Sequence, residues 1–367
     1  MCFPVGLPII CCSNIDISSG TITLPAQALE RTVGPGELKR GYIESWNLIV
    51  ERKLPADFLV SVGYVGTQTV HQFADLNINA ALPGPGQSAL GQPLNCAQAN
   101  LTRTACITPG FGRTTETDLW QGYLSANYHS LQVSINRQFT HGLMVKGAYT
   151  YSKAIDFTDD DGWAGLAWND TSILRRNRAR AGFDTPQIFQ MAYVYELPIG
   201  RGKKWASGGG VAEKIASDWQ ISGIFSAIHG QPFSLTASGT SLNAVAQRQT
   251  PDQVAAVHKL GGIGGVASGN HFYDPTSFVA VSTAATYGNV GRNTLFGPGS
   301  VNMDFSLFRT FRVKERLDLQ FRADAANFFN SPHFNLPNGN LTSGNFLRVT
   351  SAKDDERQFR FGLRLAF

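Results

Sequence analysis

The feature that most constrains this chain is an alternation of apolar and polar residues with a period of two, which recurs in segments of about ten residues. Phe58, Val60 and Val62 lie on one side of an extended chain, and Ser61 and Gly63 lie on the other. The pattern predicts nine strands, at residues 42–51, 58–67, 130–136, 143–153, 189–197, 219–229, 302–307, 317–324 and 358–367.

The length of these segments suits a membrane. Ten residues at ~3.3 Å each, tilted by ~45°, rise roughly 23 Å, and the apolar band of an outer-membrane barrel is ~25 Å tall. The second face carries charges at regular intervals, which a packed sandwich core would not hold but a wet lumen accepts. These charges are Lys146, Asp304, Asp318, Arg322 and Asp324. The alternative is a soluble antiparallel sheet with its polar face in water.

The connections between these strands alternate in length, as in bacterial outer-membrane barrels with short periplasmic turns and long outer loops. Short links fall at residues 52–57, 140–142 and 313–316, and a moderate one follows Leu197. The long links are residues 68–127, 154–187, 230–300 and 330–357. A soluble sandwich has no reason for such alternation.

Orientation and strand number together predict an open barrel. If the last strand descends to the periplasm, the first of nine strands begins outside the cell, whereas a complete barrel has an even number of strands. We therefore expect an all-β fold, an antiparallel transmembrane β-barrel that is partial, with nine to ten strands. Residues 1–41 are expected to be an irregular start within an outer loop, unless residues 15–24 supply a strand, and residues 42–367 to be the C-terminal portion of a barrel.

Composition and motifs exclude other classes. Only 16% of residues are charged, the net charge is +4, and no run approaches the ~20 apolar residues of a spanning helix, so neither nucleic acid nor the inner membrane is implied. We expect no cofactor and no enzyme active site, because nucleophile-elbow and phosphate-loop motifs are absent. Cys96 and Cys106, ten residues apart, either form a loop disulfide or remain free. Residues 159–161, all Asp, form a calcium-binding loop or, as favoured, a solvated acidic one. Trp163, Trp168 and Phe183 line a ligand vestibule or anchor the barrel at the membrane interface.

The last ten residues, QFRFGLRLAF, end on an aromatic carboxy-terminus. They resemble the outer-membrane assembly signal at Arg360, Gly362, Leu365 and Phe367. A terminal strand with this pattern offers an edge for strand pairing with the barrel-assembly machinery and places an aromatic ring at the interface.

Several longer segments resemble one family, the TonB-dependent receptors with an N-terminal carboxypeptidase-regulatory-like domain. They are residues 42–68, 127–156, 189–205 and FRADAANFFNSPHFNLPN at 321–338. The resemblance implies a barrel in the outer membrane that imports a scarce nutrient, a small-molecule or oligomeric ligand, with membrane lipid around it. It also implies a regulatory-like domain, a plug and a TonB-contacting box before residue 1. A small passive porin, an adhesin-like barrel and a secreted β-rich binding module remain the alternatives.

Overall fold

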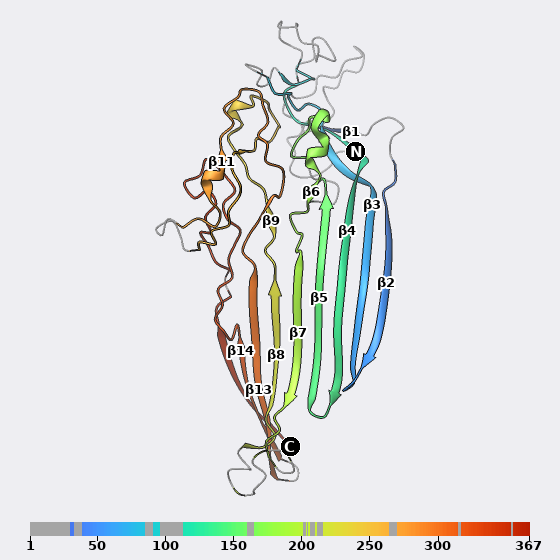
Figure 1. The fold of residues 1–367 in the computed structure, drawn as a ribbon, viewed down its shortest axis with the longest axis vertical. Helices are drawn as coiled ribbons and strands as arrows, with labels where there is room; N and C mark the ends of the chain where they lie inside the picture. Colours follow the sequence, from blue (N-terminus) through green and yellow to red (C-terminus); the bar gives the residue numbers. More distant parts are fainter. Residues whose placement is uncertain are drawn as a thin grey trace, which may run out of the picture.

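Nine long strands lie side by side along the long axis of the molecule and form most of one eleven-stranded sheet (Figure 1). The computed structural model describes residues 30–32, 39–84, 91–95, 113–159, 165–200, 203, 205, 210, 216–263, 270–314, 317–353 and 355–367. In sheet order the nine strands are β2 (Tyr42–Leu54), β3 (Phe58–Asn77), β4 (Thr117–Thr140), β5 (Leu143–Asp156), β7 (Gln187–Glu196), β8 (Gln220–Ile228), β13 (Ser300–Lys314), β14 (Leu317–Ala326) and β15 (Gln358–Ala366). All nine predicted strands are confirmed.

Every neighbouring pair among these nine strands is antiparallel. The hairpins predicted from the short links are therefore confirmed. Among the described turns that join neighbouring long strands, the tightest is His141–Gly142, where φ is 49° and 77°. Two consecutive residues with positive φ match the right-handed twist of the flanking strands, and glycine accepts that conformation without strain.

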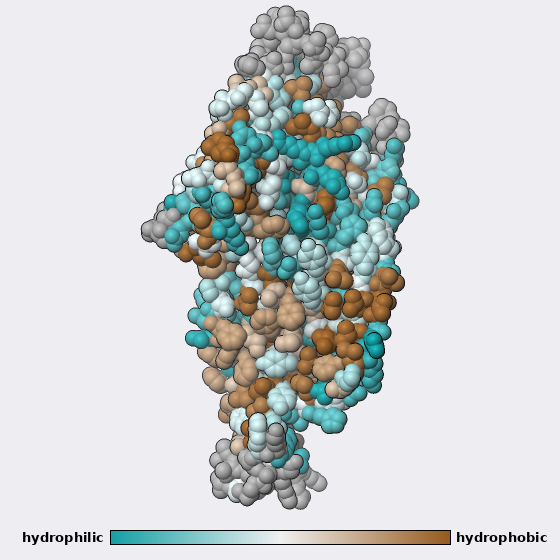
Figure 2. Space-filling model, in the orientation of Figure 1, coloured by the Kyte–Doolittle hydropathy of each residue, from teal (hydrophilic) through white to brown (hydrophobic). Residues whose placement is uncertain are grey.

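The pairing register aligns apolar rows with apolar rows across the sheet. Val62 faces Val133, and Val133 faces Tyr149 on the next strand. One position along, Ser61 faces Ser134, so the opposite face is polar. Apolar residues gather over the strand-built half of the molecule, and polar residues prevail over the loop-built half (Figure 2). One face of the sheet therefore suits lipid and the other a wet lumen.

Two strands are at least twice as long as the predicted ten residues, since β3 has 20 residues and β4 has 24. The additional residues continue the strand pairing beyond the apolar rows. No lipid contacts this part, so its residues need not alternate between apolar and polar, and the sequence pattern does not predict it as strand. The register shifts at His71, which has φ of 56° and lies between Val70 and Gln72. Such a bulge bends the extended hairpin.

The two edges of the sheet are β2 and β15, and within the described residues these strands do not pair with each other. Every residue of β2 is exposed, as is nearly every residue of β15. The predicted open sheet is thus confirmed for the described part of the chain. Because an odd number of antiparallel strands separates the edges, β2 and β15 run in the same direction.

The long loops gather beyond one end of the strands (Figure 1). Their short elements are β1 (Glu30–Thr32), η2 (Thr171–Asn177), β6 (Ala179–Arg180), β9 (Pro232–Phe233), η3 (Gly239–Ser241), β10 (Asp252–Gln253), η5 (Pro275–Ser277), β11 (Phe278–Val279) and β12 (Leu295–Phe296). The loops 229–299 and 327–357 share a hydrophobic core that includes Leu235, Phe272 and Leu347. We call this folded loop body the cap. No helix among the described residues has the length and apolar character to cross a bilayer.

Candidate functional site

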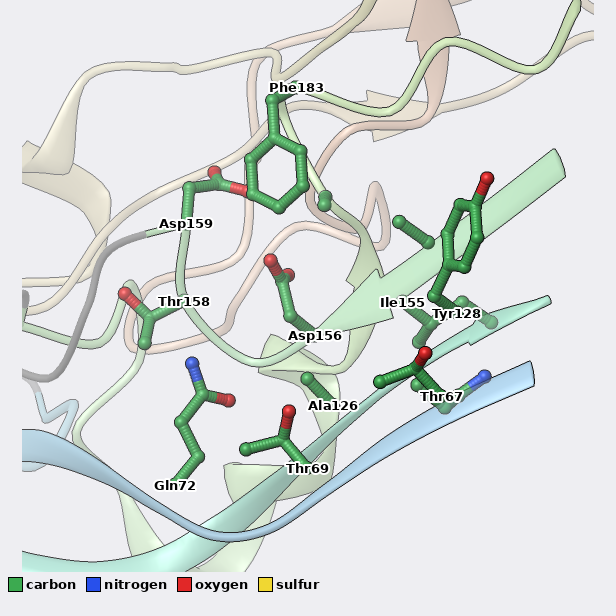
Figure 3. Close-up of a pocket in the computed structure, with 13 residues that line it drawn as sticks. Thr67, Thr69, Gln72, Ala126, Tyr128, Ile155, Asp156, Thr158, Asp159 and Phe183 are labelled. Carbon is green, nitrogen blue, oxygen red and sulfur yellow. The ribbon is translucent and has the colours of Figure 1, made fainter. Parts of the chain in front are cut away.

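A pocket of about 560 Å³ lies on the polar face of the sheet, at the end of the strands nearest the cap (Figure 3). Its floor is built from inward-facing residues of three strands, which are Thr67, Thr69, Ala126, Tyr128, Ala154 and Asp156. Four residues of the loop that follows β5 form the wall, namely Thr158, Asp159, Ala181 and Phe183, and Gln72, Asn127 and Ile155 also line the pocket. The site is thus formed where a lumen wall meets an outer loop.

The pocket offers hydrogen-bonding groups beside aromatic surface. Thr67 and Thr69 present hydroxyls, Asp159 presents a carboxylate, and the Phe183 ring is 60% exposed. No group of three or more His, Cys, Asp or Glu residues within the described part of the chain is placed to hold a metal ion. The arrangement suits a polar organic ligand with an apolar face, because polar groups fix its orientation and a ring contributes apolar contact.

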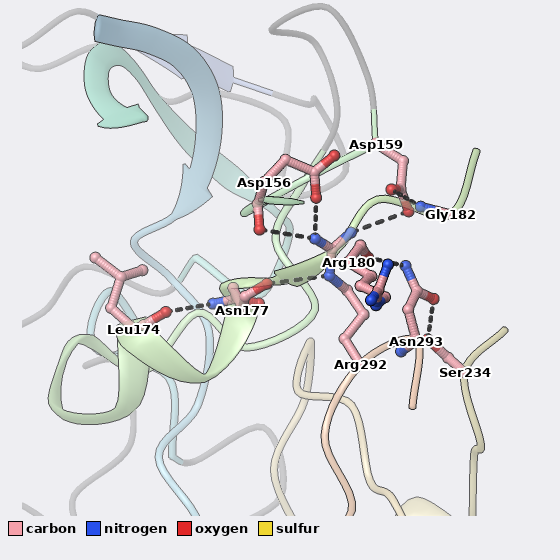
Figure 4. A network of polar contacts seen from close by, with 9 residues as sticks. All are labelled: Asp156, Asp159, Leu174, Asn177, Arg180, Gly182, Ser234, Arg292 and Asn293. Carbon is pink, nitrogen blue, oxygen red and sulfur yellow. Dashed lines mark hydrogen bonds and ion pairs between the residues drawn. The ribbon is translucent and has the colours of Figure 1, made fainter. Parts of the chain in front are cut away.

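The pocket wall is held by Arg292, which reaches from the β8–β13 loop to the end of β5 (Figure 4). Its guanidinium binds the carboxylate of Asp156 and donates to the Asp156 carbonyl at 3.0 Å. Nη1 lies 2.9 Å from Oδ2 of Asp159, and Nε donates to the Asn177 carbonyl at 3.0 Å. The side chains of Arg292 and Asp156 are each only 5% exposed. One arginine therefore fixes three positions of the pocket loop.

The neighbouring residue Asn293 adds a second link between the same loops (Figure 4). Its side-chain amide donates to the Arg180 carbonyl at 2.8 Å, and its backbone N–H donates to Ser234 Oγ at 3.0 Å. Arg180 in turn pairs with Asp184 at 2.5 Å. These contacts join the pocket loop to the β8–β13 loop.

The carboxyl group of Asp156 lies beyond the membrane-spanning part of β5, at the pocket floor. Burial raises the pKa of Asp156 to about 6, although the bound Arg292 guanidinium lowers it. Desolvation therefore exceeds the effect of the ion pair. The charge of the pocket changes in a pH range that cells encounter.

A second arginine, Arg176, locks η2 against the cap. Its guanidinium lies 4.5 Å from the ring of Trp168 and donates to the Val290 carbonyl at 2.7 Å. The indole N–H of Trp168 donates to the Arg248 carbonyl at 3.0 Å, and Trp168 is fully buried. The prediction that Trp168 lines a vestibule or anchors the interface is wrong, because its side chain is buried in the interior of the loops.

The other residues predicted from the sequence are distributed differently. Phe183 does line the pocket. Trp163, Cys96, Cys106, Asp160 and Asp161 lie outside the described residues, so the disulfide and the full acidic loop stay predictions. Asp159 is an ion-pair partner of Arg292.

The four residues of the proposed assembly signal lie on or just after β15. Arg360 and Gly362 occupy the polar face, where Arg360 stands opposite Asp324. Leu365 occupies the apolar face opposite Leu319, and Phe367, after the strand, is 99% exposed. The polar and apolar positions of the pattern therefore lie on opposite faces of β15. Recognition by assembly factors stays a prediction.

Comparisons with known proteins bear on the class of protein. The sheet resembles parts of three solved structures, all at low identity. These are the outer membrane transporter YddB from Escherichia coli (9% identity, TM-score 0.47, 92% of this chain and 34% of that one), the ferric-catecholate import receptor Fiu from E. coli K12 (13%, 0.40, 93% and 30%) and the ferripyoverdine receptor of Pseudomonas aeruginosa (10%, 0.37, 89% and 27%). The chain thus spans about a third of their length. No curated protein sequence matches it.

An amphipathic antiparallel sheet with an outward apolar band defines an outer-membrane barrel protein. The model of the family described as "Outer membrane beta barrel domain" matches residues 3–360. The chain belongs to this family, and its location is the outer membrane.

Proposed function

We propose that the chain is the barrel segment of a TonB-dependent receptor and takes part in importing a scarce nutrient. The sequence segments noted above support this assignment. The observation that carries it is the pocket, which lies on the lumen face directly beneath outer loops fixed by Arg292. A passive pore has no need of a pocket held by a buried ion pair.

The ligand enters from outside and first meets Phe183 and Asp159. We infer that ligand and plug together fill the lumen, and that energy comes through TonB by way of a box and a plug domain in the complete receptor. The hydroxyls of Thr67 and Thr69 then orient the ligand by hydrogen bonds. In this proposal the C-terminal strand, with Arg360, Gly362, Leu365 and Phe367, is what the barrel-assembly machinery engages, and membrane lipid surrounds the apolar face.

The proposal is tested by uptake into cells that carry the chain within its complete receptor. One labelled probe represents each ligand class: a ferric catecholate, maltohexaose and a hexapeptide. We expect uptake of one probe, its loss in a strain without TonB, and a fall of about tenfold or more in apparent affinity for Phe183→Ala. Phe329→Ala is the matched control, because Phe329 is similarly exposed (64%) and does not line the pocket.

Other outcomes favour the alternatives. Uptake that persists without TonB indicates a passive porin. Surface binding without any uptake indicates an adhesin-like barrel, and equal affinities for the Phe183 and Phe329 variants contradict the pocket as the ligand site.

A further inference from the structure

A row of residues crosses the apolar face of β2, β3, β4 and β5 at the end nearest the cap. The pairing register places Trp46 beside Gly66, Gly66 beside His129, and His129 beside Lys153. We call these four residues the rim row. The next row toward the membrane centre contains Leu48, Tyr64, Leu131 and Tyr151. The rim row therefore marks where the lipid-facing surface changes from apolar to polar.

Aromatic rings anchor this boundary. The ring of Trp46 lies directly over Gly66, where an added Cβ would stand 2.4 Å from the indole. Trp46 and Tyr64 each have a ring centroid 6.2 Å from that of His129. Trp46, Tyr64 and Tyr151 are 40%, 39% and 52% exposed. Exposed Trp and Tyr in adjacent rows near one end of the strands are typical of the membrane–water interface of a barrel.

Positive charge lies at and just above this level. Lys153 is exposed in the rim row itself. Arg178, also exposed, donates from Nη2 to Asn127 Oδ1 at 2.7 Å, and Asn127 is the next outward position on β4 after His129. Neither Lys153 nor Arg178 forms an ion pair with any other described residue. The nearest outward acid in the register is Glu44, which lies two strands away from Asn127.

The side chain of His129, in the rim row beside Lys153, is oriented by Tyr64. The hydroxyl of Tyr64 lies 2.7 Å from Nδ1 of His129. When this hydroxyl donates to Nδ1, the hydrogen of the neutral imidazole is on Nε2, which is then a donor. Lys153, Arg178 and His129 thus provide donors within two adjacent rows, about 7 Å apart along the strand.

We propose that the rim row and Arg178 bind a phosphate group of an outer-leaflet glycolipid. Arginine and lysine bind phosphate through charge-assisted hydrogen bonds, and basic residues at a membrane surface attract anionic headgroups. The position selects a lipid as the source of the phosphate. The donors lie on the outward face immediately above the aromatic level, where a headgroup sits, and only Asn127, the hydrogen-bond partner of Arg178, also lines the nutrient pocket.

The test uses the complete receptor that contains this chain, purified from outer membranes in a non-ionic detergent and titrated with lipid A that carries both phosphates. We expect the Lys153→Gln, Arg178→Gln double variant to bind lipid A roughly thirty-fold more weakly. Each substitution removes the attraction of one basic side chain to an anionic headgroup, and the two losses multiply. Lys146→Gln is the matched control, because Lys146 is an exposed lysine of the same strand on the lumen face. We expect it to bind as wild type, and Lys153→Arg to retain binding, which excludes misfolding as the cause.

Three results would overturn the proposal. The double variant binds lipid A as tightly as wild type, or dephosphorylated lipid A binds equally well, or inorganic phosphate displaces lipid A at equal concentration, which would indicate a free-phosphate site. None of these depends on nutrient uptake, so failure here is separate from failure of the transport proposal.

Discussion

Arg292 binds the carboxylate of Asp156 although 136 positions separate them in the chain. The contact joins the β8–β13 loop to the end of β5, so the pocket loop and the cap are one mechanical unit. Asp159, bound by the same guanidinium, extends the unit to the pocket mouth.

Arg292 and Asp156 are not equivalent partners, and we expect substitutions of the two residues to destabilise the pocket loop to different degrees. Arg292→Gln leaves the nearly buried Asp156 without its cation, and removing one member of a buried pair costs about 3–5 kcal/mol. Asp156→Asn keeps an acceptor, while Arg292 retains Asp159. We expect amide hydrogen exchange in residues 165–186 to accelerate strongly in the Arg292 variant and slightly in the Asp156 variant. Equal acceleration would contradict the assignment.

The raised pKa of Asp156 gives that loop a pH dependence with a defined sign. The unfolded carboxyl titrates near pH 3.9 and the folded one at about 6, so the folded loop holds its proton more tightly. The resulting stabilisation is complete below about pH 4 and is lost as the pH rises through about 6. We expect exchange protection of this loop to fall between pH 4.5 and 7, and Asp156→Asn to remove that change. A wild-type protection that rises over the same range would show that the ion pair dominates.

Trp168 should contribute to stability rather than to ligand binding. The ring is fully buried and stacks on Arg176, so Trp168→Ala removes a large buried side chain and is expected to cost about 3–5 kcal/mol. Trp168→Phe keeps a ring beneath the guanidinium and should cost less. Limited proteolysis of the cap measures both. Normal cap resistance together with lost ligand binding in Trp168→Ala would restore the vestibule interpretation.

The sequence predicts those parts of the fold whose residue pattern depends only on neighbouring positions in the chain. Alternation such as Phe58, Val60 and Val62 records directly which side of a strand meets lipid, so nine strands and their hairpins follow from it. The cap carries no such period: Phe272 and Leu347 share a core 75 residues apart through loops that have almost no regular strand.

The pocket also follows less directly from the sequence, because contacts between residues far apart in the chain form it. Phe183 is one of four aromatic residues in the loop 157–186, with Phe157, Trp163 and Trp168, and the sequence alone does not show which of them faces the pocket. Arg292 is one of two arginines in a loop of about seventy residues, with Arg248, and nothing local distinguishes it. Its role depends on a fold that brings residue 292 beside residue 156, which only the three-dimensional arrangement of the loops determines.

The C-terminal aromatic gives a prediction about assembly. Phe367 is almost fully exposed at the end of β15, where it suits the membrane interface. We expect Phe367→Asp to lower the amount of protein in the outer membrane several-fold, and Phe367→Tyr to retain it. Heat-modifiable migration on gels, together with surface labelling, measures folded protein. Undiminished folded protein in the Asp variant would show that the residue is not part of an assembly signal.

The two sheet edges provide the last prediction. β2 and β15 run in the same direction, whereas bacterial barrels close with antiparallel strands, so direct pairing of these edges would form a parallel seam. Each unpaired backbone group in hydrocarbon costs several kcal/mol, so every edge in the membrane needs a neighbouring strand, which in bacterial barrels is antiparallel. We expect cysteines at Leu48 and Leu363, on the two edges, to form no disulfide when the native cysteines are replaced by serine. Cysteines at Phe321 and Leu363 face each other on β14 and β15 and should cross-link readily, because facing residues of antiparallel strands have Cα atoms within disulfide range. A cross-link between Leu48→Cys and Leu363→Cys within one molecule would demonstrate a closed nine-stranded barrel and contradict the open sheet.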